Sequence, residues 1–191
     1  MKYREDQYYI ERIRAGASGE FEPLVNKYKT YAFTLALKIV RNREDAEEVA
    51  QDAFIKAYRS LHTFRMESRF STWLYSIVYN AAISRIRKKQ PDTRTIEHED
   101  YDPALASGIS DQVDALTAEE RKHYIKEALN RLHEEDAAIL VLFYMDDQSV
   151  EEITQVTGLT ATNVKTKLHR GRKKLFEQLQ HLLKTEVKSL L

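Results

Sequence analysis

The chain has 191 residues with 30 basic and 30 acidic side chains, so its formal net charge at neutral pH is zero. It has no cysteine, which excludes disulfides, thiolate metal sites, iron–sulfur clusters and cysteine nucleophiles. The longest apolar run, 137–145, is far shorter than the roughly 18 residues of a membrane span, and the charged N-terminus has no signal-peptide stretch. These features predict a soluble, cytoplasmic protein with no direct membrane insertion. Only 5 glycines and 3 prolines interrupt the chain, which favours helices.

The charge is distributed unevenly along the chain. Residues 61–91 contain six basic side chains and one acidic one, whereas residues 92–120 contain one basic and nine acidic. Residues 161–191 are basic again, with eight basic and two acidic side chains. Two basic blocks separated by an acidic one are compatible with nucleic-acid binding even though the total charge is zero.

The acidic stretch has no sustained apolar period, and two of the three prolines lie in it or at its edge. Loops longer than about 15 residues are uncommon inside a compact domain. The sequence therefore predicts an all-α protein of two small helical domains, 1–90 and 116–191, joined by a flexible acidic linker, 91–115.

Four helices are predicted in the first domain, near 4–14, 19–40, 43–61 and 71–89. In the third of these, apolar residues recur at three and four positions and form one stripe. Much of the remaining surface is acidic or amide-bearing. This surface is either a solvated helix face or a docking surface for a partner, and the pattern alone does not decide between them. Its residues are Asp45, Glu47, Glu48, Gln51 and Asp52.

The fourth predicted helix starts at a candidate N-cap, Ser71, and ends in a cluster of four cations. Aromatic residues are frequent before and within its first half. Such residues are usually core, and Trp73 is assigned to the core here. Aromatics next to cations at a helix end also suit the stacking of unpaired bases.

Two capping boxes mark helix starts in the second domain, Thr117-Ala-Glu-Glu120 and Ser149-Val-Glu-Glu152. The first helix is predicted to run to about residue 132, and a buried helix follows at 135–145. The second box opens a short helix that Gly158 can end in the left-handed conformation.

A last long helix capped by Thr160 completes a helix-turn-helix, 149–157 and 160–175. Thr154 stands where such units usually have alanine, and it fits if its hydroxyl bonds back to the preceding turn. No acidic residue lies between 161 and 176, where seven side chains are cationic or histidine. An unbroken run of cations is what neutralising DNA phosphates requires.

An enzyme is not supported, because no glycine-rich phosphate loop, HExxH pair or nucleophile elbow occurs. The six histidines have no metal-ligand spacing, so no catalytic residue, metal or cofactor is predicted. A stand-alone helix-turn-helix regulator would account for the second domain, but this interpretation leaves the first domain without a role. The apolar stripe near the C-terminus fits a dimer contact, an internal core edge or a contact with a larger partner protein.

Three segments together resemble bacterial RNA polymerase sigma factors of the extracytoplasmic-function (ECF) group. They are DAEEVAQDAFIKAY (45–58), FSTWLYSIVYNAAISRIRKK (70–89) and SVEEITQVTGLTATNVKTKLHRGRKKL (149–175). The resemblance covers nearly the whole chain. It implies a stress-response initiation factor that binds core RNA polymerase and promoter DNA, and that an anti-sigma factor sequesters.

The resemblance also assigns roles to residues. The acidic face of 45–52 corresponds to the surface that docks on the polymerase clamp helices. Promoter −10 contacts, including capture of a flipped base, fall on Phe64, Arg65, Ser68, Phe70, Ser71, Asn80, Arg85, Arg87, Lys88 and Lys89. Promoter −35 contacts fall on Thr160, Thr162, Asn163, Lys165, Thr166, His169, Arg170, Arg172 and Lys173. Thr162-Asn163 replaces the usual glycine-threonine, so the family's phosphate contacts do not transfer directly to these two positions.

The family's linker threads a polymerase channel. Its acidic character here suggests either weak adhesion to cationic channel walls or screening of the basic surfaces in the free protein. Replacing the linker acids with serine and glycine tests the second idea through the DNA affinity of the free protein.

Overall fold

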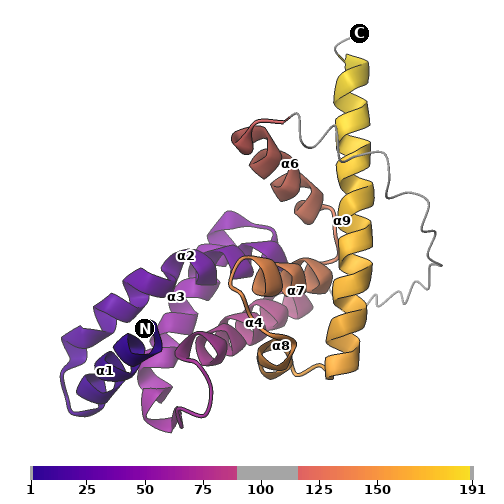
Figure 1. Ribbon diagram of the computed structural model, residues 1–191. Helices are drawn as coiled ribbons and strands as arrows, with labels where there is room; N and C mark the ends of the chain where they lie inside the picture. The colour runs from indigo at the N-terminus through magenta and orange to yellow at the C-terminus, as the bar shows by residue number, and fades with distance from the viewer. Residues whose placement is uncertain (1, 90–115, 190–191) are drawn as a thin grey trace.

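The computed structural model describes the backbone of residues 2–89 and 116–189, and the side chains of 5–88 and 116–183. All regular elements in these ranges are helices (Figure 1). The first domain contains α1 (Lys2–Arg14), α2 (Phe21–Val40), α3 (Arg43–Ser60) and α4 (Phe70–Lys89), with short 3-10 turns at Ser18–Glu20 and Leu61–Thr63. The second contains α6 (Ala118–Asn130), α7 (Glu134–Tyr144), α8 (Val150–Thr157) and α9 (Ala161–Ser189). The predicted all-α fold with two helical domains is confirmed, while the linker prediction, 91–115, lies outside the described residues.

The core of the first domain lies where α2, α3 and α4 meet. Each of these helices contributes buried apolar residues at helical spacing; those of α3 include Ala46, Val49, Ala53 and Ala57. The small residues on this stripe let α3 approach its neighbours closely. Asn42 caps α3 by accepting a hydrogen bond from the Asp45 amide at 2.9 Å. Because the apolar stripe of α3 faces the core, Glu47, Glu48, Gln51 and Asp52 lie on its exposed side.

The local helix signals of the second domain are confirmed. Thr117 and Ser149 each form a complete capping box with the glutamate three residues later. Gly158 ends α8 with φ of 74°, in the left-handed region that favours glycine. The hydroxyl of Thr160 accepts from the Asn163 amide at 3.2 Å, as expected of the cap that opens α9.

One predicted cap is wrong. α4 begins at Phe70, so Ser71 lies inside its first turn, and the Trp73 amide donates to the Arg69 carbonyl at 3.1 Å. Ser71 is also buried, where a cap would usually be exposed. The reason is tertiary, because α8 packs against this end of α4 and covers it.

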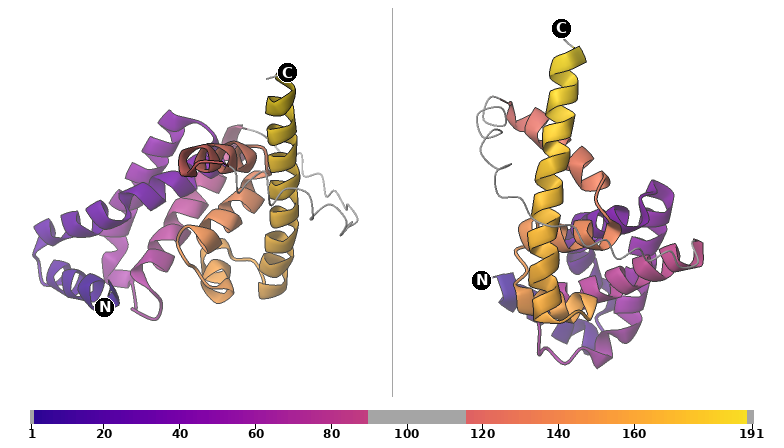
Figure 2. Two further views of the ribbon diagram at one scale, coloured as in Figure 1. Left: turned by 45° about the horizontal axis from the view of Figure 1, so that its top comes forward. Right: turned by 90° about the vertical axis from the view of Figure 1, so that its right-hand side faces the viewer.

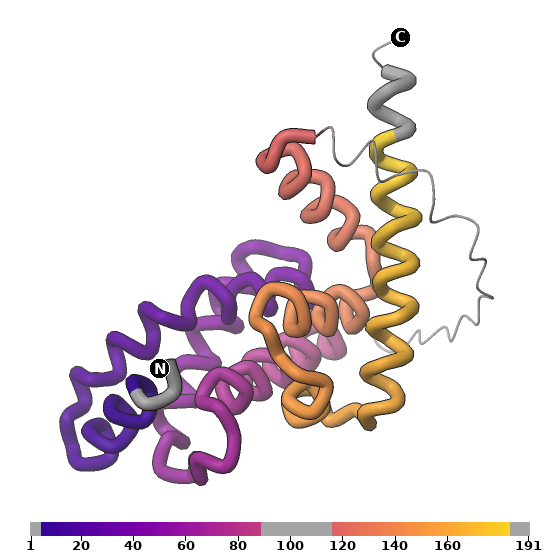
Figure 3. The backbone as a smooth tube through the Cα atoms, viewed as in Figure 1, coloured from indigo at the N-terminus to yellow at the C-terminus, as the bar shows by residue number. Residues whose placement is uncertain are grey.

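α9 runs along one side of the molecule, past α8, α7 and α6, all of which contact it (Figures 2 and 3). Val164 and Leu168 are buried against the other helices of the second domain. Further along α9, Leu175 packs against the core and Leu183 is buried. Among the three readings of the C-terminal apolar stripe, these contacts favour an internal core edge.

The two domains also pack against each other. α8 contacts α4, and α7 contacts α2, although these pairs are far apart in the sequence (Figure 1). Polar contacts cross this boundary: Tyr75 to Asp146 at 3.1 Å, Thr72 to Gln148 at 2.9 Å, Arg69 to Glu152 at 2.8 Å and Lys38 to Asn130 at 2.8 Å. Buried apolar side chains of both domains belong to one continuous core, and these polar contacts add to it. Within the described residues, no helix is both long enough and apolar enough to cross a membrane.

Candidate functional site

The predicted docking face on α3 is at the surface. Glu47, Glu48, Gln51 and Asp52 are exposed, and Glu47 forms an exposed ion pair with Arg43 at 2.9 Å. Asp45 differs from the other four because its residue is only 7% exposed and lies under the C-terminal half of α4. Four of the five predicted docking residues are therefore accessible to a partner. Asp45 is not, and it pairs with Arg85 of α4 instead.

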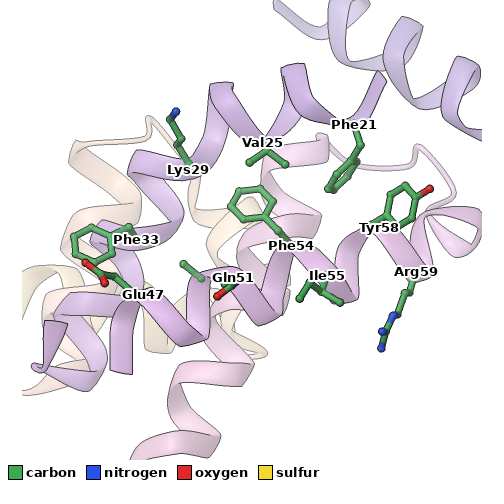
Figure 4. Close-up of a pocket in the computed structure, with 11 residues that line it drawn as sticks. Phe21, Val25, Lys29, Phe33, Glu47, Gln51, Phe54, Ile55, Tyr58 and Arg59 are labelled. Atoms are coloured by element: carbon green, nitrogen blue, oxygen red, sulfur yellow. The ribbon is translucent and has the colours of Figure 1, made fainter. Parts of the chain in front are cut away.

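An apolar groove of about 830 Å³ lies beside this acidic face, between α2 and α3 (Figure 4). Its apolar lining includes Phe21, Phe33 and Phe54, while Glu47 and Gln51 of the docking face also line it. Ile55 and Tyr58 extend the apolar surface and are 43% and 42% exposed. Large exposed apolar side chains around a groove are characteristic of an interaction surface. This groove was not predicted, because Tyr58 falls on the apolar stripe of α3 by its helical spacing, which predicts burial, and the pattern indicates no role for Ile55.

The cationic end of α4 is divided between two environments. Arg87 and Lys88 are exposed and available to a phosphate backbone, whereas Arg85 turns toward α3 and pairs with Asp45 and Glu48. The side chain of Lys89 lies outside the described residues. Of the predicted −10 cations in this cluster, Arg87 and Lys88 are thus the ones that the structure leaves open to DNA.

The predicted base-capture loop starts from an aromatic cluster. Phe64 and Phe70 are 5% and 3% exposed, and their rings lie 6.0 Å apart. Trp73 is half-buried and stacks at a tilt on Phe64, with ring centroids 5.0 Å apart. Between the two phenylalanines, Arg65 is exposed and Ser68 is half-buried. The structure therefore places both phenylalanines beneath the loop, and Trp73 packs with them as predicted.

Replacing Phe70 with alanine is expected to lower the free energy of unfolding by about 3–5 kcal/mol, since it removes a buried ring that three neighbouring rings contact. Urea unfolding followed by circular dichroism measures this loss. Arg65→Ala is the matched variant on the same loop and is expected to leave stability within about 0.5 kcal/mol. An unchanged unfolding midpoint for Phe70→Ala would contradict the burial of this ring.

Other predicted −10 residues lie along α4. Asn80 is exposed, although its amide donates to the Ser76 carbonyl at 2.7 Å. Ser71 is buried, and next to it the Thr72 hydroxyl donates to Gln148 and Glu152 of the second domain. In this arrangement, α8 covers the start of α4 and separates Ser71 from solvent.

A buried polar cluster ties the two domains together at this place. The Asp146 carboxylate accepts from Tyr75 at 3.1 Å and from Gln148 at 2.7 Å. Burial raises the pKa of the Asp146 carboxyl to about 6, an effect that these two hydrogen bonds partly offset and that nearby Glu152 increases. Burial also raises the pKa of the Tyr75 hydroxyl, so Tyr75 acts as a neutral donor.

The cluster makes the stability of the protein pH-dependent. The folded protein takes up a proton on Asp146 near pH 6, whereas an unfolded aspartate takes one up only near about 3.9. Lowering the pH from 7 to 5 should therefore increase the free energy of unfolding of the wild-type chain relative to Asp146→Asn, which has no such proton to bind. Urea titrations at the two pH values measure the difference, and equal pH responses of the two proteins would contradict it.

The exposed side of α9 carries the predicted −35 residues. Val164 and Leu168 point into the core, and the opposite side of the helix is exposed at Thr162, Asn163, Lys165, Thr166, His169 and Arg170. Thr160 is also exposed at the N-cap. Lys167, which was left out of the predicted set, is held by Glu135 at 3.0 Å and Asp136 at 3.4 Å. The helix therefore presents a basic and amide-bearing surface that fits a major groove.

The last two predicted −35 residues are also engaged within α9. The Arg172 guanidinium donates to the Leu168 carbonyl at 3.1 Å, and Lys173 lies 3.7 Å from Glu177. The Thr154 hydroxyl donates to the Glu151 carbonyl at 2.6 Å, so the predicted back-bond of this residue is confirmed.

Gly171 is a structural residue that the sequence analysis missed. It is buried on α9, and a β-carbon at this position would lie 3.2 Å from a methyl group of Leu140. A β-carbon here would require the Leu140 side chain, which comes from α7, to move by a few tenths of an ångström. A glycine inside an otherwise regular helix was the available signal.

In the described part of the chain, no three or more histidine, aspartate or glutamate side chains gather where a metal ion could bind. The arrangement offers surfaces instead: an acidic face beside an apolar groove on α3, exposed cations at the end of α4, and a basic face on α9.

Two known families match the chain. Residues 24–91 match Sigma-70 region 2, and residues 122–175 match Sigma-70, region 4. The first match covers the acidic face and the end of α4, and the second covers the helix-turn-helix.

Curated relatives match over nearly their whole length. The ECF RNA polymerase sigma factor SigW of Bacillus subtilis is 34% identical, over 91% of this chain and 96% of its own. The RNA polymerase sigma-H factor of Pseudomonas aeruginosa is 32% identical, over 96% and 98%. The ECF RNA polymerase sigma-E factor of Escherichia coli is 30% identical, over 94% and 96%.

Solved structures share the fold. CnrH, in a complex with the cytosolic domain of CnrY, has a TM-score of 0.65 at 21% identity and covers 93% of this chain and 98% of its own. RpoE of Bartonella quintana, crystallised with the anti-sigma factor NepR, has a TM-score of 0.62 at 23% identity, covering 84% and 97%.

Proposed function

Because the chain belongs to the ECF group of RNA polymerase sigma factors, which direct the polymerase to promoters, we propose how its residues divide this work. The first domain, 1–90, docks on core polymerase and opens the −10 element, and the second domain, 116–191, reads the −35 element. The observation that carries this assignment is the separation of surfaces: carboxylates are exposed on the first half of α3, whereas the exposed cations at the end of α4 and along α9 lie on other helices.

Docking uses α3 and the groove beside it. An exposed acidic face attracts a basic partner surface and accelerates the encounter, while the apolar groove supplies surface to bury. Ile55 and Tyr58 stand at the junction of the two, where a partner helix would cover them. This combination of a charged rim and an apolar centre is the usual anatomy of a specific interface.

Opening of the −10 element uses the loop above the aromatic cluster. A flipped base costs a few kcal/mol of stacking, which contacts with the loop and with Asn80 offset. Arg65, Arg87 and Lys88 hold the phosphate backbone around the opened strand. Because the polymerase itself makes RNA, we propose no catalytic activity for this chain.

Reading of the −35 element uses the exposed side of α9. The amide of Asn163 and the guanidinium of Arg170 suit base edges, whereas Lys165 suits phosphates. Thr162 and Thr166 lie on the same side of the helix and complete the contact surface.

The two domains must separate for both elements to be read together. The −10 and −35 elements are centred about 25 base pairs apart, or about 85 Å of B-DNA at about 3.4 Å per base pair. A compact chain of this length is roughly 40 Å across. Such a separation breaks the contacts of Thr72 and Arg69 with the second domain and uncovers Ser71.

An anti-sigma factor is the expected regulatory partner, and stress response is the expected setting. The solved relatives CnrH and RpoE bind CnrY and NepR, which supports the same kind of partner for this chain. Since the partner polymerase is cytoplasmic, the chain is expected to act in the cytoplasm.

Co-elution with core RNA polymerase on a sizing column tests the proposal. A one-to-one complex that initiates transcription from a supercoiled promoter is the expected result. No complex, together with tight sequence-specific binding of the free chain to duplex DNA, would contradict it and favour a stand-alone helix-turn-helix regulator.

A further inference from the structure

Arg85 has a different environment from its neighbours at the end of α4. Its Nε and one terminal nitrogen lie 3.1 and 2.8 Å from the Asp45 carboxylate, and both terminal nitrogens contact Glu48, one of them at 3.0 Å. All three nitrogens of the guanidinium are thus engaged by two carboxylates of α3. A DNA phosphate would have to break these hydrogen bonds before Arg85 could hold it.

The two carboxylates need this cation. Asp45 and Glu48 are three residues apart on one helix, so their like charges repel each other. Asp45 is also buried, and a buried carboxylate is costly unless it is paired. The hydrogen bonds from Arg85 to Glu48 and Asp45 raise the pKa of the guanidinium, in agreement with mutual stabilisation of the three charges.

Arg87 and Lys88 provide the contrast. Both are exposed, and neither makes an ion pair within the part of the chain that the structure describes. They lie two and three residues from Arg85 and share its charge. Arg85 is paired and its neighbours are exposed because each residue lies on a different side of α4.

We propose that Arg85 is a positioning residue of the polymerase-docking face, holding the carboxylate of Glu48 in place and neutralising Asp45 beneath it, and that it is not a ligand of promoter phosphates. This inference rests on the proposed function of the α3 face. It moves Arg85 from the −10 contacts to the docking surface.

The two terminal nitrogens of Arg85 bind the two oxygens of the Glu48 carboxylate, and this pair of hydrogen bonds fixes the orientation of the carboxylate. That orientation determines how well Glu48 can pair with a cation of the partner. Lysine keeps the positive charge but cannot form this pair of hydrogen bonds. Arg85→Lys should therefore retain the fold and recover only part of the docking affinity.

The experiment compares Arg85→Ala, Arg85→Lys and the control Arg87→Ala, each with and without Glu48→Gln. Affinity for core polymerase is measured with a fluorophore on one engineered cysteine, which is unambiguous because the chain has none of its own. The salt dependence of promoter binding is measured on the saturated polymerase complex.

Arg85→Ala is expected to weaken polymerase binding about tenfold or more, and Arg85→Lys by less. The effect of Arg85→Ala should largely disappear in the Glu48→Gln background, because the group it positions is then already altered. A merely structural role would not produce this coupling. Arg87→Ala should leave polymerase affinity within about twofold and should lower the salt slope of promoter binding by about 1, whereas Arg85→Ala should leave that slope unchanged.

Arg85→Ala removes the guanidinium beside the buried Asp45 carboxylate, so a second variant controls for misfolding. Asp45→Asn with Arg85→Gln removes both charges, keeps hydrogen-bonding groups at the site and should show the same loss of polymerase affinity. Unchanged affinity in both variants, with a reduced salt slope for Arg85→Ala, would overturn the inference and return Arg85 to the DNA contacts. If the wild-type chain itself does not bind polymerase, the proposed function is wrong. This result differs from one in which the wild-type chain binds and the Arg85 variants bind equally well, which contradicts only the inference about Arg85.

Discussion

The double charge reversal Glu47→Lys, Asp52→Lys is expected to weaken binding to core RNA polymerase by about 100-fold or more. The two carboxylates stand on the exposed side of α3, and lysines there would face the basic surface that the acidic face attracts, which costs several kcal/mol. The fold should survive, because both residues are exposed and the pair between Glu47 and Arg43 is at the surface. Fluorescence anisotropy of the labelled chain against core polymerase measures the affinity.

The matched control is Glu11→Lys, Glu151→Lys, which changes the net charge by the same amount on α1 and α8. Its affinity for polymerase should stay within about threefold of the wild type, because these residues lie away from the α3 face. Equal losses in the two double variants would show that total charge, and not the α3 face, governs binding. Retained affinity in the Glu47, Asp52 variant would refute the docking assignment.

Glu48 is deliberately left out of this test. Its partner Arg85 would face a lysine after Glu48→Lys, so a loss of binding could come from rearrangement of α4 against α3. Glu47 and Asp52 make no contact with Arg85 among the described residues, which makes them the cleaner probes of the docking face.

The second large effect is expected on the −35 element. Asn163→Ala with Arg170→Ala should weaken binding of the polymerase complex to a promoter by about 2–6 kcal/mol, since each contact with a base edge contributes about 1–3 kcal/mol. The two residues are two turns apart on the same side of α9, or about 10 Å, so their effects should add. This corresponds to about 30-fold to 10⁴-fold in affinity.

Lys122→Ala, an exposed cation on α6, is the control and should leave promoter affinity nearly unchanged. Competition between promoters with a matched and an altered −35 element separates base reading from phosphate contact. Loss of preference between the two promoters is expected for the double variant. Equal affinity of the double variant and the wild type would remove these residues from the reading surface.

Local features of the fold could be read from the sequence. The capping boxes at Thr117 and Ser149 and the left-handed glycine at 158 depend on residues within one helix turn, so their spacing in the sequence is enough. The apolar stripe of α3 was likewise visible from its helical period. The exposed side of α9 followed from its anchors Val164 and Leu168, which the structure buries.

Features that depend on distant segments could not be read in this way. Arg85 meets carboxylates 37 and 40 residues earlier in the chain, and nothing in the local pattern of α4 separates it from Arg87. The burial of Ser71 depends on α8, which arrives from the other domain. The groove on α3 depends on Phe21 and Phe33 of α2, whose aromatic character alone predicts only a core.

The predicted −10 and −35 residues differ in how far their surroundings depend on the boundary between the domains. The exposed side of α9 is formed within the second domain alone. Near the start of α4, by contrast, Thr72 and Tyr75 donate hydrogen bonds to Gln148 and Asp146 of the second domain. The local pattern of α4 does not show which of its side chains contact the second domain.

Sequencing the 5′ ends of transcripts made by core polymerase on a library of random DNA fragments, with and without the chain, shows whether the chain directs the polymerase to promoters. We expect new start sites that appear only with the chain and share two upstream motifs, one near −10 and one near −35. Arg170→Ala should weaken the −35 motif while leaving the −10 motif unchanged. Start sites identical to those of core polymerase alone would show that the chain does not select promoters.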